Sequence, residues 1–584
     1  MYLRWRAMWL VLSGFKRLRF SADRIRKTLN GVGVMSTLNP NNDSHTNNIK
    51  NNDIAFTAPH FKATEAGQKI LAQGGTAIEA MVAAAATIAV VYPHMNGLGG
   101  DGFWLISEPG KAPIGIDASG KSAALATLDF YCGHDSIPAR GGKAALTMAG
   151  AVAGWQEALA VSQTWQAVSN AQNMPLKDLL KDAIELAKNG SEVTKTYLDA
   201  SNKTFADLVS VQGFASTFLK QGSLYEQGDN LILPVLAQTL EQLAEKGLND
   251  FYQGDIATRL AKDLATAGSP IRLTDFHSYQ AKRVEPLQVK TSVGSLYNLP
   301  APTQGIASLL ILALYDKLYT QGKSATDMAH LLIECTKQAF IARNQFVTDE
   351  SRLAMDLSSL LDDEQLEKMC HEIALERAQA WPHQAKHGDT IWMGACDSEG
   401  RMVSYIQSLY WEFGSGVVSP STGIVWNNRG SSFSLEKGSL QELGPNLKPF
   451  HTLNPAFAEL NDGRRMSYGT MGGEGQPQTQ AALFSRYVYH QMPLAQAISE
   501  GRWLLGRTWG DVSHNLKIER DFADMVAEEL VNRGHDLVVV DSCNELMGHA
   551  GAVVLHNEGH TEAATDPRSD GLAIDSHFIR NNLI

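Results

Sequence analysis

The chain has 584 residues, of which 44% are hydrophobic and 19% are charged, and its formal net charge is −12. This composition provides a large buried core and excludes a disordered chain, and the acidic balance argues against a nucleic-acid-binding protein, which would carry a basic surface. The length allows three or four average domains, or one large enzyme built from two interlocked parts that acts on small molecules.

Five cysteines are scattered along the chain and form no CxxC pair: Cys132, Cys335, Cys370, Cys396 and Cys543. An odd number of unclustered cysteines predicts reduced thiols and a cytoplasmic protein. The sequence contains no HExxH motif and no close group of His and Cys residues, so we expect neither a metal nor another cofactor.

The first 54 residues are expected to be a disordered or non-native leader. Basic residues flank the apolar run 7–12, which is too short to cross a bilayer, so no membrane partner is expected. If this segment acts as a signal, the protein is periplasmic; alternatively, translation begins at Met35. Residues 36–53 are polar and rich in Asn, as in a solvated segment.

Folded sequence is predicted to begin near Ala55, with a helix over 61–73 that ends at a Gly-Gly pair. Thr76 and Glu79 have the spacing of a capping box and begin a second helix. That helix is apolar on all sides and stops at Pro93, so we expect it to be buried between layers. A glycine-rich turn then precedes FWLI (103–106), a predicted strand.

The middle of the chain is predicted to be mainly helical, and the end to alternate strands and helices. Helices are expected at 176–189, 235–247, 326–342 and 362–381, and a Pro-rich turn at 299–304 precedes another. Strands are expected at 390–396, 402–409, 423–428, 537–541 and 551–556, with helices at 478–489 and 521–533. Tight turns between the first of these strands indicate an antiparallel sheet, and the whole pattern predicts an α/β layered fold.

Residues 115–122 match the phosphate-binding pattern GxxxxGK[ST], and LVVVD at 537–541 is similar to a second nucleotide-binding strand. A phosphate loop must follow a buried apolar strand directly, so that its amides converge on the ligand. Here a turn, 110–114, precedes it, and the second strand lies over 400 residues away. A P-loop nucleotide-binding protein is therefore a distant alternative.

The dipeptide Asp389-Thr390 stands at the start of a predicted strand. If the chain is cut between these residues, Thr390 gains a free α-amine beside its own hydroxyl. That amine has a pKa near 8, so one residue supplies both the nucleophile and its base. A threonine at the start of a strand is also a common structural feature, because β-branched residues favour strands. The surrounding motifs decide between the two interpretations.

Those motifs resemble the γ-glutamyltransferase family. The stretch TIWMGACDSEGRMVSYIQSLYWEFGSGVVSPSTGIVWNN begins at Thr390, and GQKILAQGGTAIEAMVAAAATIAVVYPHMNGLGGDGF, NLPAPTQG and ECTKQAFIAR match family segments further upstream. The resemblance extends over about 55–580. It implies an αββα N-terminal-nucleophile hydrolase sandwich, in which two stacked antiparallel sheets lie between helical layers. It also implies a precursor that cuts itself into a large subunit, 55–389, and a small subunit, 390–584.

The resemblance assigns roles to particular residues. Thr390 falls on the nucleophile, and Ser408 on a second hydroxyl that bonds to the nucleophile and assists processing. Gly472 and Gly473 fall on the glycine pair whose amides form the oxyanion hole.

The substrate-binding positions depart from the family. Ser119 stands where glutathione-cleaving members have an Arg that binds the α-carboxylate, and Lys121 could replace that Arg only from another place. An acidic residue that holds the α-amine is missing from 427–433, where Arg429 has entered. The candidate substrate-binding residues are Arg429, Asn428, Tyr410, Ser432, His451, Thr452 and Ser119.

Losing both ends of a zwitterion clamp disfavours a γ-glutamyl substrate, because its charges would be left unpaired. The motif style is closer to an oxamate amidohydrolase and cephalosporin-acylase-like branch. We therefore expect hydrolysis of an amide with a small carboxylated acyl group, with Arg429 holding the carboxylate. Two alternatives stay open: Arg429 pairs with an acid such as Glu412, and the enzyme is a glutathione hydrolase or γ-glutamyl transferase.

Overall fold

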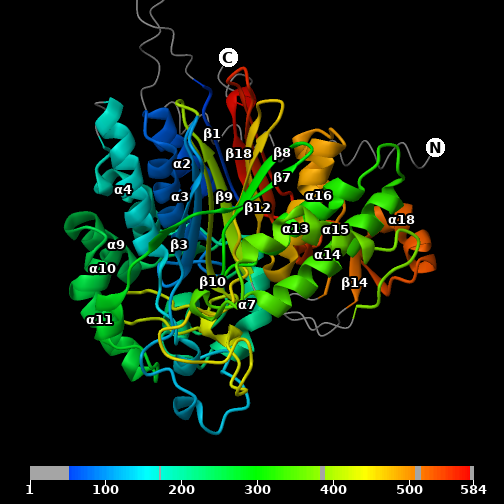
Figure 1. Ribbon diagram of the computed structural model, residues 1–584. Coiled ribbons are helices and arrows are strands. Elements are labelled where there is room, and N and C mark those ends of the chain that lie inside the picture. The colour runs from blue at the N-terminus through cyan, green and yellow to red at the C-terminus, as the bar shows by residue number, and fades with distance from the viewer. Residues whose placement is uncertain (1–51, 170–172, 382–388, 507–514, 579–584) are drawn as a thin grey trace, which may run out of the picture.

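The computed structural model describes residues 52–169, 173–381, 389–506 and 515–578. In Figure 1 the strands stand together in the middle, with α2, α3 and α4 on one side and α13, α14 and α16 on the other. The predicted leader falls mainly on 1–51, outside the described residues. Residues 52 and 53 already belong to the fold, because their N–H groups each donate over 2.8 Å, Asn52 to the Ser398 carbonyl and Asp53 to the Gly559 carbonyl.

Two antiparallel sheets form the centre of the molecule. The order in the first sheet is β18 (Leu572–Ile574), β1 (Ala55–Ala58), β9 (Asp389–Cys396), β10 (Met402–Tyr410), β2 (Asp101–Ser107), β3 (Ile114–Ala118) and β6 (Lys282–Val284). The order in the second is β17 (Thr561–Thr565), β16 (Ala550–Leu555), β12 (Arg465–Thr470), β11 (Ala456–Leu460), β8 (Gly294–Asn298) and β7 (Leu287–Thr291). The predicted αββα sandwich is confirmed.

The two sheets pack face to face through Trp392 of β9. Its indole lies against two glycines of the second sheet, Gly469 of β12 and Gly551 of β16: a Cβ added at Gly469 would be 2.2 Å from the Trp392 ring, and one at Gly551 would be 2.6 Å from it. The indole Nε1 donates to Ser404 Oγ over 2.9 Å. Because side chains two residues apart in a strand share a face, Thr390 also points between the sheets.

Helices cover the outer face of each sheet. The first layer contains α2 (Phe61–Ala72), α3 (Ala77–Val91) and α4 (Ala151–Ser169), and the second contains α13 (Gly305–Leu318), α14 (Ala325–Phe346) and α16 (Gln476–Phe484). Helix α3 is buried along its whole length, as its apolar sequence predicts. Its capping box is present, with Thr76 N–H donating to Glu79 Oε2 over 2.9 Å and Glu79 N–H donating to Thr76 Oγ1 over 3.1 Å.

The remaining elements extend the two layers. The helices are α5 (Leu176–Leu179), α6 (Lys181–Asn189), α7 (Lys195–Leu208), α8 (Phe214–Phe218), α9 (Pro234–Lys246), α10 (Asp250–Gln253), α11 (Asp255–Thr266), α12 (Leu273–Ser278), α15 (Asp363–His371), α17 (Leu494–Ser499) and α18 (Arg520–Asn532). Strands β13 (Trp503–Leu505), β14 (Leu516–Glu519) and β15 (Leu537–Val540) form a small sheet, and β4 (Ser191–Glu192) pairs with β5 (Asn230–Leu231).

Three predicted elements differ from the structure. The helix expected at 176–189 breaks at Leu180, which lets the adjacent side chains Leu179 and Leu180 both reach the core. The helix expected at 362–381 ends at His371, because the following backbone bonds to side chains of α14 instead. Residues 423–428 form isolated bridges rather than a third strand, since their backbone crosses other segments, such as Gly99, at single points.

The phosphate-loop alternative is wrong. Residues 115–118 lie inside β3, which pairs with β2 and β6, so the first half of the motif is a sheet strand rather than a loop that could surround a phosphate. Strand β15 belongs to the separate small sheet. Among the described residues, no helix combines the length and apolar character needed to cross a membrane. The five cysteines are unpaired, as predicted.

Candidate active site

Thr390 is fully buried near the start of β9, with its hydroxyl between two polar side chains. Its Oγ1 donates to Ser408 Oγ of β10 over 3.4 Å and accepts from Gln476 Nε2, at the start of α16, over 3.4 Å. The Thr390 hydroxyl therefore contacts one side chain from the first sheet and one from a helix that covers the second sheet. Contacts of this length are common in catalytic sites that tighten when substrate binds.

A β-bulge holds Ser408 in place. Ile391 pairs with Gln407, but Asp389 pairs with Tyr410, so β10 contains one extra residue beside the Asp389–Thr390 bond. Tyr410 adopts a positive φ of 85° and donates its N–H to Ser408 Oγ over 2.7 Å. A non-glycine residue in this conformation costs about 1–3 kcal/mol, and such strain concentrates at functional sites.

Gly472 and Gly473 form the turn between β12 and α16, with φ values of 116° and 53°. These left-handed conformations favour glycine. Neither glycine N–H donates to another group in the part of the chain that the structure describes, whereas the Gly473 carbonyl accepts from Gln304 Nε2 over 2.8 Å. Two buried, adjacent N–H donors at a helix start can stabilise a developing oxyanion.

Arg429 is a fully buried cation whose guanidinium lies 3.7 Å from the centre of the Tyr410 ring. Its Nη1 donates to Thr452 Oγ1 over 3.2 Å. Among the described residues, its Nε and Nη2 have no hydrogen-bond partner. These two atoms form one edge of the guanidinium, and that edge can bind a carboxylate through two parallel hydrogen bonds.

The acid that faces Arg429 is Asp101, not Glu412. Asp101 Oδ2 lies 3.8 Å from Arg429 Nε, whereas Glu412 lies 3.4 Å from Lys203. Asp101 is the first residue of β2, and it accepts from the Gly120 N–H over 2.8 Å. Its other oxygen lies 3.0 Å from His451 Nε2.

Burial shifts the titration of this group of residues. It raises the pKa of Asp101 to about 7, although Arg429 and the Gly120 N–H oppose the change. Burial lowers the pKa of Arg429 to about 10, partly offset by Tyr410 and Asp101. Burial, with repulsion from Arg429 and Lys448, also lowers the pKa of His451. His451 is therefore neutral and donates its Nε2 proton to Asp101.

Hydrogen bonds through Gln476 and Asn454 connect the nucleophile to this buried cation. Gln476 Oε1 accepts from Asn454 Nδ2 over 3.0 Å, and Asn454 Nδ2 also donates to the Thr452 carbonyl over 2.9 Å. Thr452 in turn accepts from Arg429, which lies over Tyr410. A continuous set of hydrogen bonds thus runs from Thr390 to the guanidinium and passes through both the carbonyl and the hydroxyl of Thr452.

Three predicted substrate-binding residues have other neighbours. Asn428 bonds to the backbone of Ala139 and Trp411, so it supports the wall beside Tyr410. Ser432 lies beside the Tyr410 side chain and lowers its pKa, although burial raises that pKa overall. Ser119 directs its hydroxyl to Asp117 over 2.6 Å, and Lys121 is exposed, so neither occupies the position of a carboxylate-binding Arg.

Sequence reasoning missed Asp101, Gln476 and Gln304. Asp101 gave one signal, a single charge inside the glycine-rich turn GLGGDGF. Gln476 follows the glycine pair by three residues, on the helix that the pair begins. Gln304 lies in the predicted large subunit, but it donates to the carbonyls of Gly473 and Thr452 in the predicted small subunit. No spacing in the sequence relates these positions.

Comparisons with known proteins fit this geometry. The family model for γ-glutamyltranspeptidase matches residues 63–576. The chain belongs to the γ-glutamyltransferase family. Oxamate amidohydrolase proenzyme of Klebsiella pneumoniae is 49% identical over 529 residues, which cover 91% of this chain and 99% of that protein. A glutathione hydrolase-like proenzyme of Bacillus subtilis is 37% identical over 88% of this chain and 97% of that protein.

The fold of the family is also found in the solved structures. A cephalosporin acylase from Bacillus halodurans matches with a TM-score of 0.79 and 28% identity, over 93% of this chain and 99% of that one. This γ-glutamyltransferase family member is therefore an amide hydrolase of the N-terminal-nucleophile class.

Proposed function

We propose that the protein cuts itself before Thr390 and then hydrolyses the amide of a small carboxylated acyl group, of which oxamate is the simplest example. The observation that carries the substrate assignment is the buried Nε–Nη2 edge of Arg429, which makes no hydrogen bond to the described residues and faces Asp101 only at 3.8 Å. The similarity to a relative named oxamate amidohydrolase proenzyme supports the same assignment.

Maturation would use the hydroxyl of Thr390. Its Oγ1 attacks the Asp389 carbonyl carbon, the peptide nitrogen leaves as the new α-amine, and water hydrolyses the resulting ester. The bulge at Tyr410 lies opposite this bond and supports the proposal, since it holds Ser408 Oγ beside the Thr390 hydroxyl that would attack. The products would be a large subunit ending at Asp389 and a small subunit of 390–584.

Turnover would repeat this chemistry on the substrate. Thr390 Oγ1 attacks the amide carbon while the free α-amine takes the hydroxyl proton. The N–H groups of Gly472 and Gly473 stabilise the oxyanion. The amine then passes the proton to the leaving nitrogen, so ammonia departs from a primary amide. Water, deprotonated by the same amine, releases the acid from the acyl-threonine.

Arg429 would hold the carboxylate next to the reacting carbonyl. Thr452 and Tyr410 fix the guanidinium, and its Nε–Nη2 edge can then make a bidentate contact with the substrate carboxylate. A γ-glutamyl group would bring its α-ammonium towards this cation, and Ser119 supplies no replacement for the missing Arg. These features favour the small carboxylated amide over glutathione. The five unpaired cysteines support a cytoplasmic location.

Two substrates distinguish these activities. We expect ammonia release from oxamate to exceed anilide release from a γ-glutamyl anilide by at least about tenfold in kcat/KM, because an unpaired buried charge costs several kcal/mol. Thr390→Ala should abolish both reactions and leave the chain as one band. A preference for the γ-glutamyl anilide would overturn the substrate assignment.

A further inference from the structure

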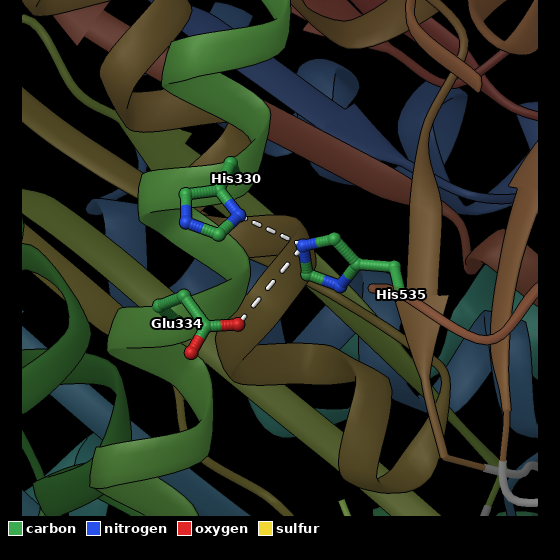
Figure 2. A group of neighbouring side chains, drawn as sticks. All are labelled: His330, Glu334 and His535. Carbon is green, nitrogen blue, oxygen red and sulfur yellow. Dashed lines mark hydrogen bonds and ion pairs between the residues drawn. The ribbon is translucent and has the colours of Figure 1, made fainter. Parts of the chain in front are cut away.

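A second cluster of buried polar side chains, formed by His330, Glu334 and His535, is drawn in Figure 2. His330 and Glu334 are on α14, and His535 follows α18. His330 Nδ1 lies 2.8 Å from His535 Nε2, and Glu334 Oε1 lies 4.0 Å from the same nitrogen. These groups could hold a divalent cation, but the Lys337 ammonium occupies the same Glu334 oxygen at 2.7 Å and would repel it.

A hydrogen bond, rather than a metal ion, connects the two histidines. His330 Nε2 lies 2.9 Å from the Ala374 carbonyl, so it carries a proton and Nδ1 accepts from His535 Nε2. Burial lowers the pKa of His330 and lowers that of His535 to about 3, which keeps both rings neutral. Each histidine therefore donates one hydrogen bond within the cluster.

The segment 374–381, here called the tail, completes the cluster. Gln379 donates its N–H to Glu334 Oε2 over 3.0 Å, and its carbonyl accepts from Lys337 Nζ over 2.5 Å. Its side chain also accepts from Gln338 Nε2 over 2.8 Å. Glu334 and Lys337 are both buried, and a buried ion pair is stable only when its remaining hydrogen-bonding positions are filled. The tail fills them.

The end of α18 holds the tail from the other side. The Arg533 carbonyl accepts from the Ala378 N–H over 2.7 Å, and Arg533 Nη1 donates to the Leu375 carbonyl over 3.3 Å. Arg533 Nη2 also pairs with Asp327 of α14 over 2.6 Å. Arg533 and His535 thus join the tail and α14 to a part of the chain that lies beyond Thr390.

We propose that this cluster is an intersubunit clasp, in which Arg533 and His535 of the small subunit retain the tail and α14 of the large subunit after cleavage. The inference rests on the proposed cut before Thr390, which assigns α14 and the tail to one subunit and Arg533 and His535 to the other. In the precursor both ends of the tail are tethered. Cleavage frees one end of the tail, so the clasp must then hold the tail against the small subunit.

Hydrogen exchange of the tail amides tests the clasp. In the cleaved protein we expect Arg533→Ala and His535→Gln to speed exchange at Ala378 and Gln379 by about tenfold, since the first removes the side-chain bonds to Leu375 and Asp327 and the second removes the bond to the buried His330. The same changes in uncleaved Thr390→Ala protein should have a smaller effect. Arg520→Ala is the matched control, because Arg520 of α18 pairs only loosely with Asp541, at 3.8 Å.

The outcomes separate the clasp from the proposed function. If the chain is never cut, the maturation proposal fails. The cluster then lies within one chain, so the clasp is also overturned as an intersubunit contact. If the chain is cut and both variants exchange at the wild-type rate, only the clasp is overturned. Arg533→Lys is a conservative variant that should fold normally. It keeps a cation for Asp327 but loses the second donor, which bonds to the Leu375 carbonyl, so the tail amides should exchange at a rate between those of wild type and Arg533→Ala.

Discussion

Replacing Arg429 by Gln tests the carboxylate contact that defines the proposed substrate. The substitution removes the buried charge and the Nε–Nη2 edge but keeps a polar side chain of moderate length. A substrate carboxylate left without its cation in a buried site loses about 3 kcal/mol or more, and 1.4 kcal/mol corresponds to a factor of ten. We therefore expect kcat/KM for oxamate to fall by about 150-fold.

The same substitution should not destabilise the protein. Arg429 is fully buried, its Nε and Nη2 make no hydrogen bond to the described residues, and its pairing with Asp101 is long, at 3.8 Å, so its burial already costs free energy. We expect a melting temperature no more than ~2 °C below wild type, and unchanged self-cleavage, because no contact joins Arg429 to Thr390 directly.

Steady-state ammonia release, with thermal melts of the same samples, measures both effects. Thr452→Val is the matched control, since it removes only the neutral acceptor of Arg429 Nη1 and should cost about 1 kcal/mol, or about fivefold in kcat/KM. The carboxylate reasoning is refuted if Arg429→Gln retains oxamate hydrolysis within a fewfold of wild type.

Three further predictions follow from the site and the core. Because the pKa of Asp101 is raised to about 7, the carboxyl gains its proton as pH falls from 8 to 6 and stops competing with the substrate carboxylate for Arg429. The KM for oxamate should therefore fall over this range, and in Asp101→Asn the KM should not change with pH. Ser408→Ala should slow self-cleavage at least about tenfold, measured by band intensities over time, because the Thr390 hydroxyl loses its acceptor. Gly120→Ala would place a Cβ 1.7 Å from the Met148 carbonyl oxygen and should lower the melting temperature far more than Gly110→Ala, where nothing lies within 4 Å and only the positive φ of 75° adds strain; equal losses would contradict the packing.

Local signals in the sequence predicted the elements that depend on neighbours along the chain. The capping box at Thr76 requires only residues three apart, and the β9–β10 hairpin requires a short turn between two apolar strands. Both are present. The motif resemblance placed Thr390, Ser408 and the glycine pair, and the structure puts Thr390 beside Ser408.

Contacts between distant segments could not be predicted in this way. Asp101, Arg429 and His451 come from three separate parts of the chain and meet only because β2 and β10 are neighbours and the loop after β10 folds back. The sequence therefore offered Glu412 as an example of an acid that could pair with Arg429, whereas the acid that faces it is Asp101. The helix predicted beyond His371 failed for the same reason, since the tail bonds to α14 across the fold.

Intact mass measurement of active protein tests the central claim most directly. The account predicts two chains, one ending at Asp389 and one of 195 residues that begins with a free Thr390 amine, in proportion to the activity. Active material in which residues 389 and 390 remain joined would contradict it, because Thr390 would then have no base of its own.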